Sequence, residues 1–152
     1  MAEPEAAAGA DPVRHVVFRV VGERYALPLG TVREVVVPQP PFARVPRVSE
    51  AVRGVMNLRG RVLPVVDLAP LVGLPPQPLA GGQGQVLVLE REKRSLGFLI
   101  GQVIGVEPVV VPPPGDDRVV RGVVVIKGFA VSILAPDGLA EAADGLFGSG
   151  SG

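Results

Sequence analysis

Short runs of β-branched residues, interrupted every few positions by glycine or proline, constrain this chain most. Valine dominates its apolar residues, and 20 glycines and 17 prolines punctuate a sequence of 152 residues. Such runs are typical of many short strands joined by turns. Residues 14–21 alternate between two faces, and 85–91 and 95–101 flank a polar turn across which they can pair. The pattern therefore predicts an all-β fold.

Two segments depart from this pattern and predict helix. Residues 136–147 carry apolar side chains at helical spacing, and Asp137 is a candidate N-cap. Residues 69–74 favour a single helical turn. We therefore expect short helical turns and one C-terminal helix beside the strands.

An internal repeat relates two distant hairpins. Residues 52–66 match 120–134 at a constant offset, so that Arg59-Gly60 aligns with Lys127-Gly128. Each pair lies where a hairpin must turn, and glycine supplies the positive φ that tight hairpins need. The match predicts one strand–turn–strand unit used twice, with chance similarity among valine-rich strands as the alternative.

Composition excludes several classes of function. The 15 basic and 15 acidic residues give a formal net charge of zero, so no broad basic field attracts nucleic acid or an anionic membrane. The chain has no cysteine, which excludes disulfides, thiolate nucleophiles and cysteine-based zinc sites. Residues 1–12 lack the features of a secretory signal, and we expect a disordered tail there. The longest apolar run, 95–106, is too short to span a membrane as a helix.

No cluster of chemically reactive residues points to an enzyme. His15 is the only histidine and has no partner nearby in sequence, so we interpret it as an edge or surface residue. Asp67 ends an apolar strand just before the helical turn, where its carboxylate can accept backbone N–H bonds. We predict no catalytic residue, no metal site and no cofactor.

Two single charges set among apolar residues are the better candidates for recognition. Glu34 lies in "TVREVVV", and Arg59 lies at the tip of the hairpin "NLRG". A turn tip displays its side chain from a rigid scaffold, and the guanidinium group suits recognition at an interface.

The order of these segments resembles the CheW family of chemotaxis coupling proteins. The similar stretches are "VVFRVVGERYALPLGTVREVV", "VRGVMNLRGRVLPVVDLAPLVGL", "QVLVLEREKRSLGFLIGQVIGV" and "VVRGVVVIKGFAVSILAPDGLAE", within residues 13–142. The resemblance implies two packed SH3-like five-stranded β-barrels, the second at roughly 70–120, with a tail at 143–152. It also implies a non-enzymatic adaptor that is cytoplasmic and recruited to receptor arrays.

The resemblance also implies partners and residues. One partner is the cytoplasmic tip of a methyl-accepting chemoreceptor, bound in a groove between the barrels; the other is the regulatory domain of a CheA-type histidine kinase. Carried over by motif, the residues expected on partner-binding surface are Arg59, Glu34, Val32 and Val35. The residues expected to shape turns and strand ends are Asn57, Gly60, Asp67 and Gly128.

Two departures from the family pattern keep alternatives open. An acidic residue usual after "GFLI" is absent from Gly101-Gln102-Val103, and the segment 106–121 is shorter than usual. An accessory protein that binds receptors but not the kinase, as in gliding motility, is therefore one alternative. A β-barrel that binds a small ligand is another, and a detached part of a larger kinase or CheV-like protein is a third.

Overall fold

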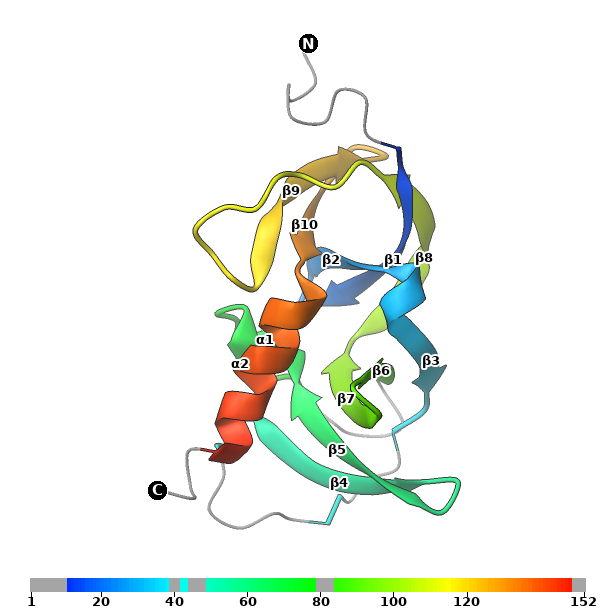
Figure 1. The fold of residues 1–152 in the computed structure, drawn as a ribbon, viewed down its shortest axis with the longest axis vertical. Helices are drawn as coiled ribbons and strands as arrows, with labels where there is room; N and C mark the ends of the chain where they lie inside the picture. Colours follow the sequence, from blue (N-terminus) through cyan, green and yellow to red (C-terminus); the bar gives the residue numbers. More distant parts are fainter. Residues whose placement is uncertain (1–10, 39–41, 44–48, 79–83, 149–152) are drawn as a thin grey trace.

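A computed structural model describes residues 11–38, 42–43, 49–78 and 84–148. Within these ranges, ten strands form two five-stranded sheets, each curled into a barrel, and one longer helix follows the last strand (Figure 1). The predicted all-β fold of two five-stranded units with a C-terminal helix is confirmed. Most of the expected N-terminal tail lies outside the described residues. Of the tail expected at 143–152, residues 143–148 instead belong to the C-terminal helix, where Ala143 is buried, and 149–152 lie outside the described residues.

The upper unit in Figure 1, which we call barrel A, has the strand order β8-β1-β2-β10-β9. Its strands are β1 (Val13–Val20), β2 (Glu23–Pro28), β8 (Gln102–Val109), β9 (Val120–Ile126) and β10 (Phe129–Leu134). The lower unit, barrel B, has the order β3-β6-β7-β5-β4. Its strands are β3 (Val32–Val36), β4 (Val52–Leu58), β5 (Arg61–Asp67), β6 (Gln85–Arg91) and β7 (Arg94–Ile100). The helices are η2 (Leu29–Thr31), α1 (Leu68–Leu71) and α2 (Pro136–Gly148).

The second barrel does not consist of residues 70–120, as the sequence had led us to expect. The chain leaves barrel A through η2, builds all of barrel B between residues 32 and 100, and re-enters barrel A at Gly101. The reason is the parallel pairing of β10 with β2, which brings the last hairpin back to the first. Barrel B repeats this arrangement with a parallel β5–β7 pair.

The internal repeat corresponds to the hairpins β4–β5 and β9–β10. In each, the two turn residues have positive φ: 54° and 82° at Arg59 and Gly60, and 50° and 86° at Lys127 and Gly128. Positive φ at both central residues is the type I′ turn, whose twist matches that of the paired strands. The repeat is therefore structural.

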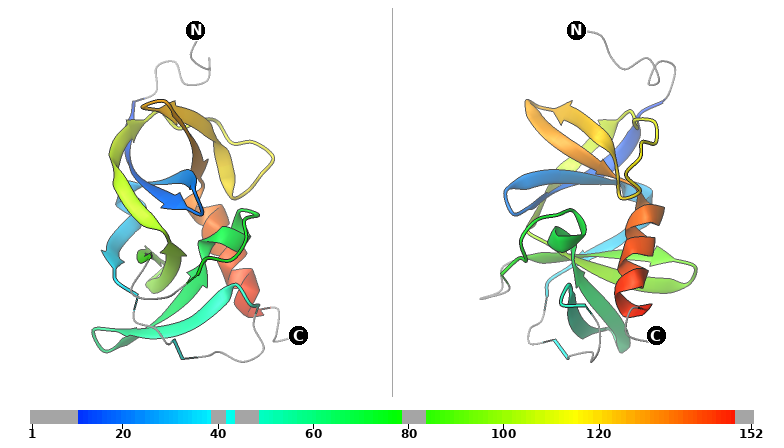
Figure 2. Two further views of the ribbon diagram at one scale, coloured as in Figure 1. Left: turned by 180° about the vertical axis from the view of Figure 1, so that it is seen from behind. Right: turned by 90° about the vertical axis from the view of Figure 1, so that its left-hand side faces the viewer.

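A shared apolar core joins the barrels and seats α2. It contains Phe18 of β1, Phe98 of β7 and Leu139 of α2, all fully buried. The helix leaves barrel A and runs down beside barrel B, as the right-hand view of Figure 2 shows. It begins at Pro136, so Asp137 lies in its first turn rather than at the expected cap position. No helix in the described ranges is long and apolar enough to cross a membrane.

His15 is buried, contrary to the expectation of an edge or surface position. Its side chain has no exposed area, because β1 is paired on one side with β8 and on the other with β2. A central strand of a curled sheet has one face inside the barrel, and His15 lies on that face.

Asp67 connects four parts of barrel B. Its buried carboxylate caps α1 by accepting from Ala69 N at 3.1 Å. It also accepts from the backbone and side-chain nitrogens of Gln77 at 2.8 and 2.7 Å, and from Arg53 Nη1 at 3.2 Å. The same Gln77 amide donates to Leu99 O of β7 at 2.7 Å. One carboxylate therefore ties β5 to four other parts: β4, α1, the segment after α1 and, through Gln77, β7.

We expect Asp67→Ala to lower the free energy of unfolding by about 2–4 kcal/mol, because several buried donors lose their acceptor. Urea unfolding monitored by circular dichroism measures the change. The control is Asp116→Ala, at an exposed aspartate, which we expect to change stability by less than about 0.5 kcal/mol. Equal effects of the two substitutions would contradict the role assigned to Asp67.

Gly54 and Gly60 allow a second matched comparison. Gly54 has φ +132°, and an added Cβ would lie 2.5 Å from Ala43 O; Gly60 has φ +82° with open space around it. We expect Gly54→Ala to cost about 3 kcal/mol or more, since strain and a backbone clash add. Gly60→Ala should cost about 1 kcal/mol, from backbone strain alone. Equilibrium unfolding in urea would refute this order if Gly60→Ala proved the more damaging.

Candidate functional site

A bidentate ion pair joins the two edges of barrel B. Arg59 donates from Nη1 to Glu34 Oε2 at 2.8 Å and from Nη2 to Glu34 Oε1 at 2.7 Å. Glu34 lies on β3 and Arg59 on the β4–β5 turn, and β3 and β4 are the outer strands of the sheet. We call the gap between the two outer strands of a barrel its seam. The two charged residues singled out from the sequence therefore meet across the seam of barrel B.

The turn fixes how Arg59 is presented. Asn57 Oδ1 accepts a hydrogen bond from Gly60 N at 2.7 Å, which closes the turn from one side. The Arg59 side chain is 71% exposed despite its two bonds, whereas that of Glu34 is 21% exposed. Neighbouring Arg61 is exposed and has no ion pair within the described part of the chain. Arg59 is thus rigidly held and accessible at the same time.

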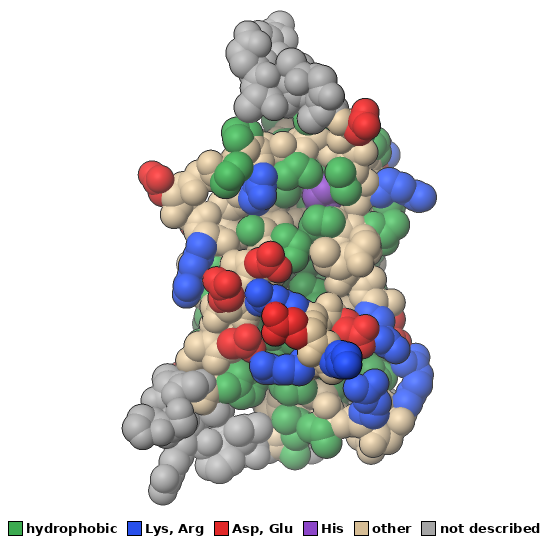
Figure 3. All heavy atoms as spheres, in the orientation of Figure 1, with side chains coloured by type: hydrophobic (Ala, Val, Ile, Leu, Met, Phe, Trp, Pro, Cys, Tyr) green, Lys and Arg blue, Asp and Glu red, His purple; other side chains and the backbone are tan. Residues whose placement is uncertain are grey.

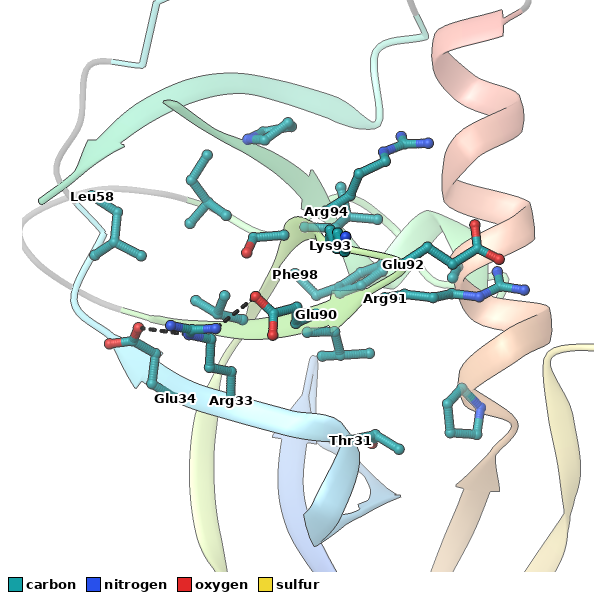
Figure 4. A pocket seen from close by; sticks show the side chains of 18 of the residues that line it. Thr31, Arg33, Glu34, Leu58, Glu90, Arg91, Glu92, Lys93, Arg94 and Phe98 are labelled. Atoms are coloured by element: carbon teal, nitrogen blue, oxygen red, sulfur yellow. Dashed lines mark hydrogen bonds and ion pairs between the residues drawn. The ribbon is translucent and has the colours of Figure 1, made fainter. Parts of the chain in front are cut away.

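A chain of alternating charges extends from this pair. Arg33 Nε lies 4.0 Å from Glu34 Oε2, and its Nη1 donates to Glu90 Oε2 at 2.6 Å (Figure 4). The hydrogen bonds from Arg59 lower the pKa of Glu34, and the nearby charges of Arg59 and Arg33 act in the same direction. The same carboxylate raises the pKa of Arg59. Both members of the pair are therefore charged throughout the neutral pH range.

The two valines expected beside Glu34 differ in exposure. Val35 is 40% exposed and points outward. Val32 is only partly exposed and packs against the shared core. Of the four residues expected on partner-binding surface, Arg59, Glu34 and Val35 thus offer accessible area, and Val32 contributes mainly to packing.

A cavity of about 740 Å³ adjoins the Arg59–Glu34 pair. These two residues contribute to one side, and Leu58, Leu89 and Leu96 give it an apolar surface. Its other side includes Ala140 and Phe147 of α2. Figure 4 shows how charged side chains of β3 and of the β6–β7 hairpin surround it. The cavity combines an apolar surface with a charged rim.

Ion pairs also attach α2 to the β6–β7 hairpin. Arg91 lies 3.6 Å from Asp137 and 4.0 Å from Glu141, and Arg94 lies 3.2 Å from Asp144. The three carboxylates are four and three residues apart, so they share one face of the helix. Acidic and basic side chains accordingly interleave across the centre of the face in Figure 3.

Barrel A has a seam contact of the same kind. Lys127 of the β9–β10 turn lies with its Nζ 3.0 Å from Glu107 Oε2 of β8, and β8 and β9 are the outer strands of that sheet. Gly128 shapes this turn as Gly60 shapes the other. Sequence reasoning missed Glu107, although the repeat had placed Lys127 at the position of Arg59.

The chemistry of these residues suits binding. No group of three metal-ligating side chains occurs among the described residues. The acidic groups at the two seams are engaged with cations. Apolar side chains make up most of the interior of each barrel, among them Val131 and Ile133 in A and Val65 and Val86 in B. This packing disfavours the alternative of a barrel that holds a small ligand.

Comparison with known proteins identifies relatives over much of the chain. Protein PilI of Pseudomonas aeruginosa is 37% identical over 90 residues, which are 59% of this chain and 49% of PilI. Chemotaxis protein CheW of Thermotoga maritima is 34% identical over 73 residues, which are 48% of this chain and 47% of that protein. The chain thus spans about half the length of these curated relatives.

The solved structure of the scaffolding protein TtCheW from Thermoanaerobacter tengcongensis superposes with a TM-score of 0.69 at 27% identity. The superposition covers 82% of this chain and 89% of TtCheW. The family described as CheW-like domain matches residues 14–144, nearly the full described length. Because that match covers more than half of the chain, and the structure has the two five-stranded barrels, the chain belongs to the CheW-like domain family.

Proposed function

We propose that this chain is a non-enzymatic cytoplasmic scaffold of a chemosensory system, coupling a methyl-accepting chemoreceptor to a CheA-type histidine kinase. Membership of the CheW-like domain family supports the scaffold role. So does the likeness to TtCheW, whose structure is described as that of a scaffolding protein. Binding of the receptor and binding of the kinase are both proposed.

The observation that carries the proposal is the bidentate Arg59–Glu34 pair at the seam of barrel B. An exposed ion pair contributes little to stability, typically about 0–1 kcal/mol. A planar guanidinium held by two bonds on a type I′ turn instead offers a fixed pattern of donors to a partner. The adjoining cavity adds apolar contact area beside that pattern. Exposed Val35 lies on the opposite face of β3, because successive side chains of a strand alternate.

A second candidate is an accessory scaffold that binds the receptor but not the kinase. The similarity to PilI, a relative that carries a different name from the CheW proteins, favours it. The short connection between β8 and β9 favours it as well: Arg121 folds back onto Pro112 O, with bonds of 2.9 and 3.2 Å. This connection belongs to barrel A, so a loss of kinase contact there leaves the seam of barrel B intact.

A two-partner binding assay distinguishes the candidates. The purified chain is titrated separately with the cytoplasmic tip of the cognate receptor and with the regulatory domain of the cognate kinase. We expect both to bind with dissociation constants on the order of micromolar, as is usual for transient contacts. Receptor binding without detectable kinase binding would select the accessory scaffold, and binding of neither would refute the proposed function.

Charge reversal tests the seam of barrel B directly. We expect Arg59→Glu to weaken at least one partner about tenfold or more, equivalent to about 1.4 kcal/mol. The reason is that a second carboxylate then faces Glu34 in place of the guanidinium. The matched control is Arg14→Glu, at an exposed arginine of β1 that does not line the cavity, which we expect to change either affinity by less than about threefold.

The swapped variant, Arg59→Glu with Glu34→Arg, separates folding from recognition. The swap restores opposite charges across the seam, so thermal stability should return to that of the unmodified chain. Binding should stay weak, because the partner meets the charges in exchanged positions. Affinity restored in full by the swap would show that the pair only closes the barrel.

A further inference from the structure

His15 is a polar group in the interior of barrel A. Its side chain has no exposed area, and Nδ1 lies 2.8 Å from Val13 O. A carbonyl oxygen only accepts, so Nδ1 carries the proton in the neutral ring. Nε2 is then an acceptor without a donor, the only buried side-chain nitrogen or oxygen in the described ranges that lacks a partner. An additional proton can be accommodated only at Nε2.

Glu107 lies directly across from His15. The two residues are Cα partners in the antiparallel β1–β8 ladder, so their side chains share one face of the sheet. Cβ atoms at such positions are about 4.5–5.5 Å apart. The carboxylate of Glu107 is bound by Lys127 at 3.0 Å, across the seam. His15 therefore lies beside the charged contact that spans the edges of barrel A.

In barrel B, the position equivalent to His15 carries an apolar residue. Counted back from their two-residue turns, His15 of β1 corresponds to Val86 of β6. Val86 is paired with Val36 of β3, and both belong to the apolar interior of barrel B. One barrel thus has two valines where the other has a histidine and a glutamate. The histidine is not a requirement of the fold.

The charges facing His15 make the effect of a proton predictable. The ladder register places Glu107 of β8 on the face of His15, and Lys127 of the β9–β10 turn reaches that carboxylate. Arg19 and Arg24 share this face at the far end of the β1–β2 ladder, where Arg24 lies over the Phe129 ring. Strand β10 has no charged residue. Asp116, Asp117 and Arg118, in the connection from β8 to β9, are exposed. Glu107 is thus the carboxylate opposite His15, and Lys127 is the cation that competes for it.

We propose that His15 is a proton sensor within barrel A: protonation of Nε2 creates an imidazolium that competes with Lys127 for Glu107 and loosens the β8–β9 seam. Burial lowers the pKa of His15 below its ordinary 6.5, while the bond to Val13 O acts in the opposite direction. The closed barrel therefore binds this proton less well than an opened one. Its stability is complete above about pH 6.5 and falls as the pH drops from there.

Hydrogen exchange measures the loosening. After correction for intrinsic rates, we expect the opening equilibrium of the outer-strand amides of β8 and β9 to rise more than about threefold from pH 7.0 to pH 5.5. A single proton allows at most about tenfold per pH unit. The outer strands β3 and β4 of barrel B are the internal control and should show no such rise.

His15→Val places the residue of barrel B in barrel A, and we expect it to abolish the acid-dependent rise. His15→Gln, which is polar but cannot titrate, serves the same purpose if the valine variant does not fold. An equal rise in the variant, or a parallel rise in barrel B, would overturn the proposal.

The competition with Lys127 has a separate test. The chain has one histidine, so a preparation without a histidine tag gives one imidazole signal in nuclear magnetic resonance. We expect Lys127→Met to raise the titration midpoint of that signal, since it removes a nearby cation and frees Glu107. The matched control, Arg59→Met at the other seam, should leave the midpoint unchanged. A midpoint that responds equally to both substitutions, or to neither, contradicts the coupling. Because these tests need no partner, they are independent of the proposed function.

Discussion

Among the described residues, neither barrel closes its sheet with a ladder of backbone hydrogen bonds between its outer strands. Strands β3 and β4 bound one sheet and β8 and β9 the other, and each pair is bridged by an ion pair from a type I′ turn. Free sheet edges are liabilities because their unpaired backbone groups can recruit other chains. The same property makes them useful in a scaffold, where recruitment is the purpose. The place where Glu34 and Arg59 meet therefore follows from how the sheet of barrel B ends.

Local features of the structure could be predicted, and features that depend on distant pairings could not. The type I′ turns follow from a basic residue and glycine at fixed positions of a repeat, and the Asp67 cap follows from its place between strand and helix. The expected 70–120 unit failed because three residues of β10 pair with β2, more than 100 positions away. His15 was misplaced for the same reason, since only β8 makes β1 a central strand. The sequence shows that residues 14–21 alternate between two faces of a strand, but it does not show which of these faces lies inside a barrel.

The ion pair between Glu34 and Arg59 could be predicted from the sequence only in part. Each residue could be singled out as a charge within an apolar run, but nothing in the sequence indicated that two residues 25 positions apart would pair. The pairing depends on sheet order, which places β6, β7 and β5 between their strands. The repeat narrows the search, since a basic turn residue at one seam predicts a carboxylate at the other. Glu107 could have been sought on these grounds once β8 was known to be an edge.

Comparison of the two barrels separates what the fold requires from what individual residues add. Both use the same turn, the same parallel pair and an ion pair at the seam, although the acidic residues are not at corresponding strand positions. They differ beneath the seam, where Val36 and Val86 in barrel B match Glu107 and His15 in barrel A. A buried imidazole with an unmatched acceptor is less favourable than packed valine, because desolvation of that nitrogen is uncompensated. Barrel B shows that the fold accepts valine at this position. The less favourable histidine in barrel A therefore calls for a chemical role. Histidine is the side chain whose ordinary pKa lets it take up a proton near neutral pH.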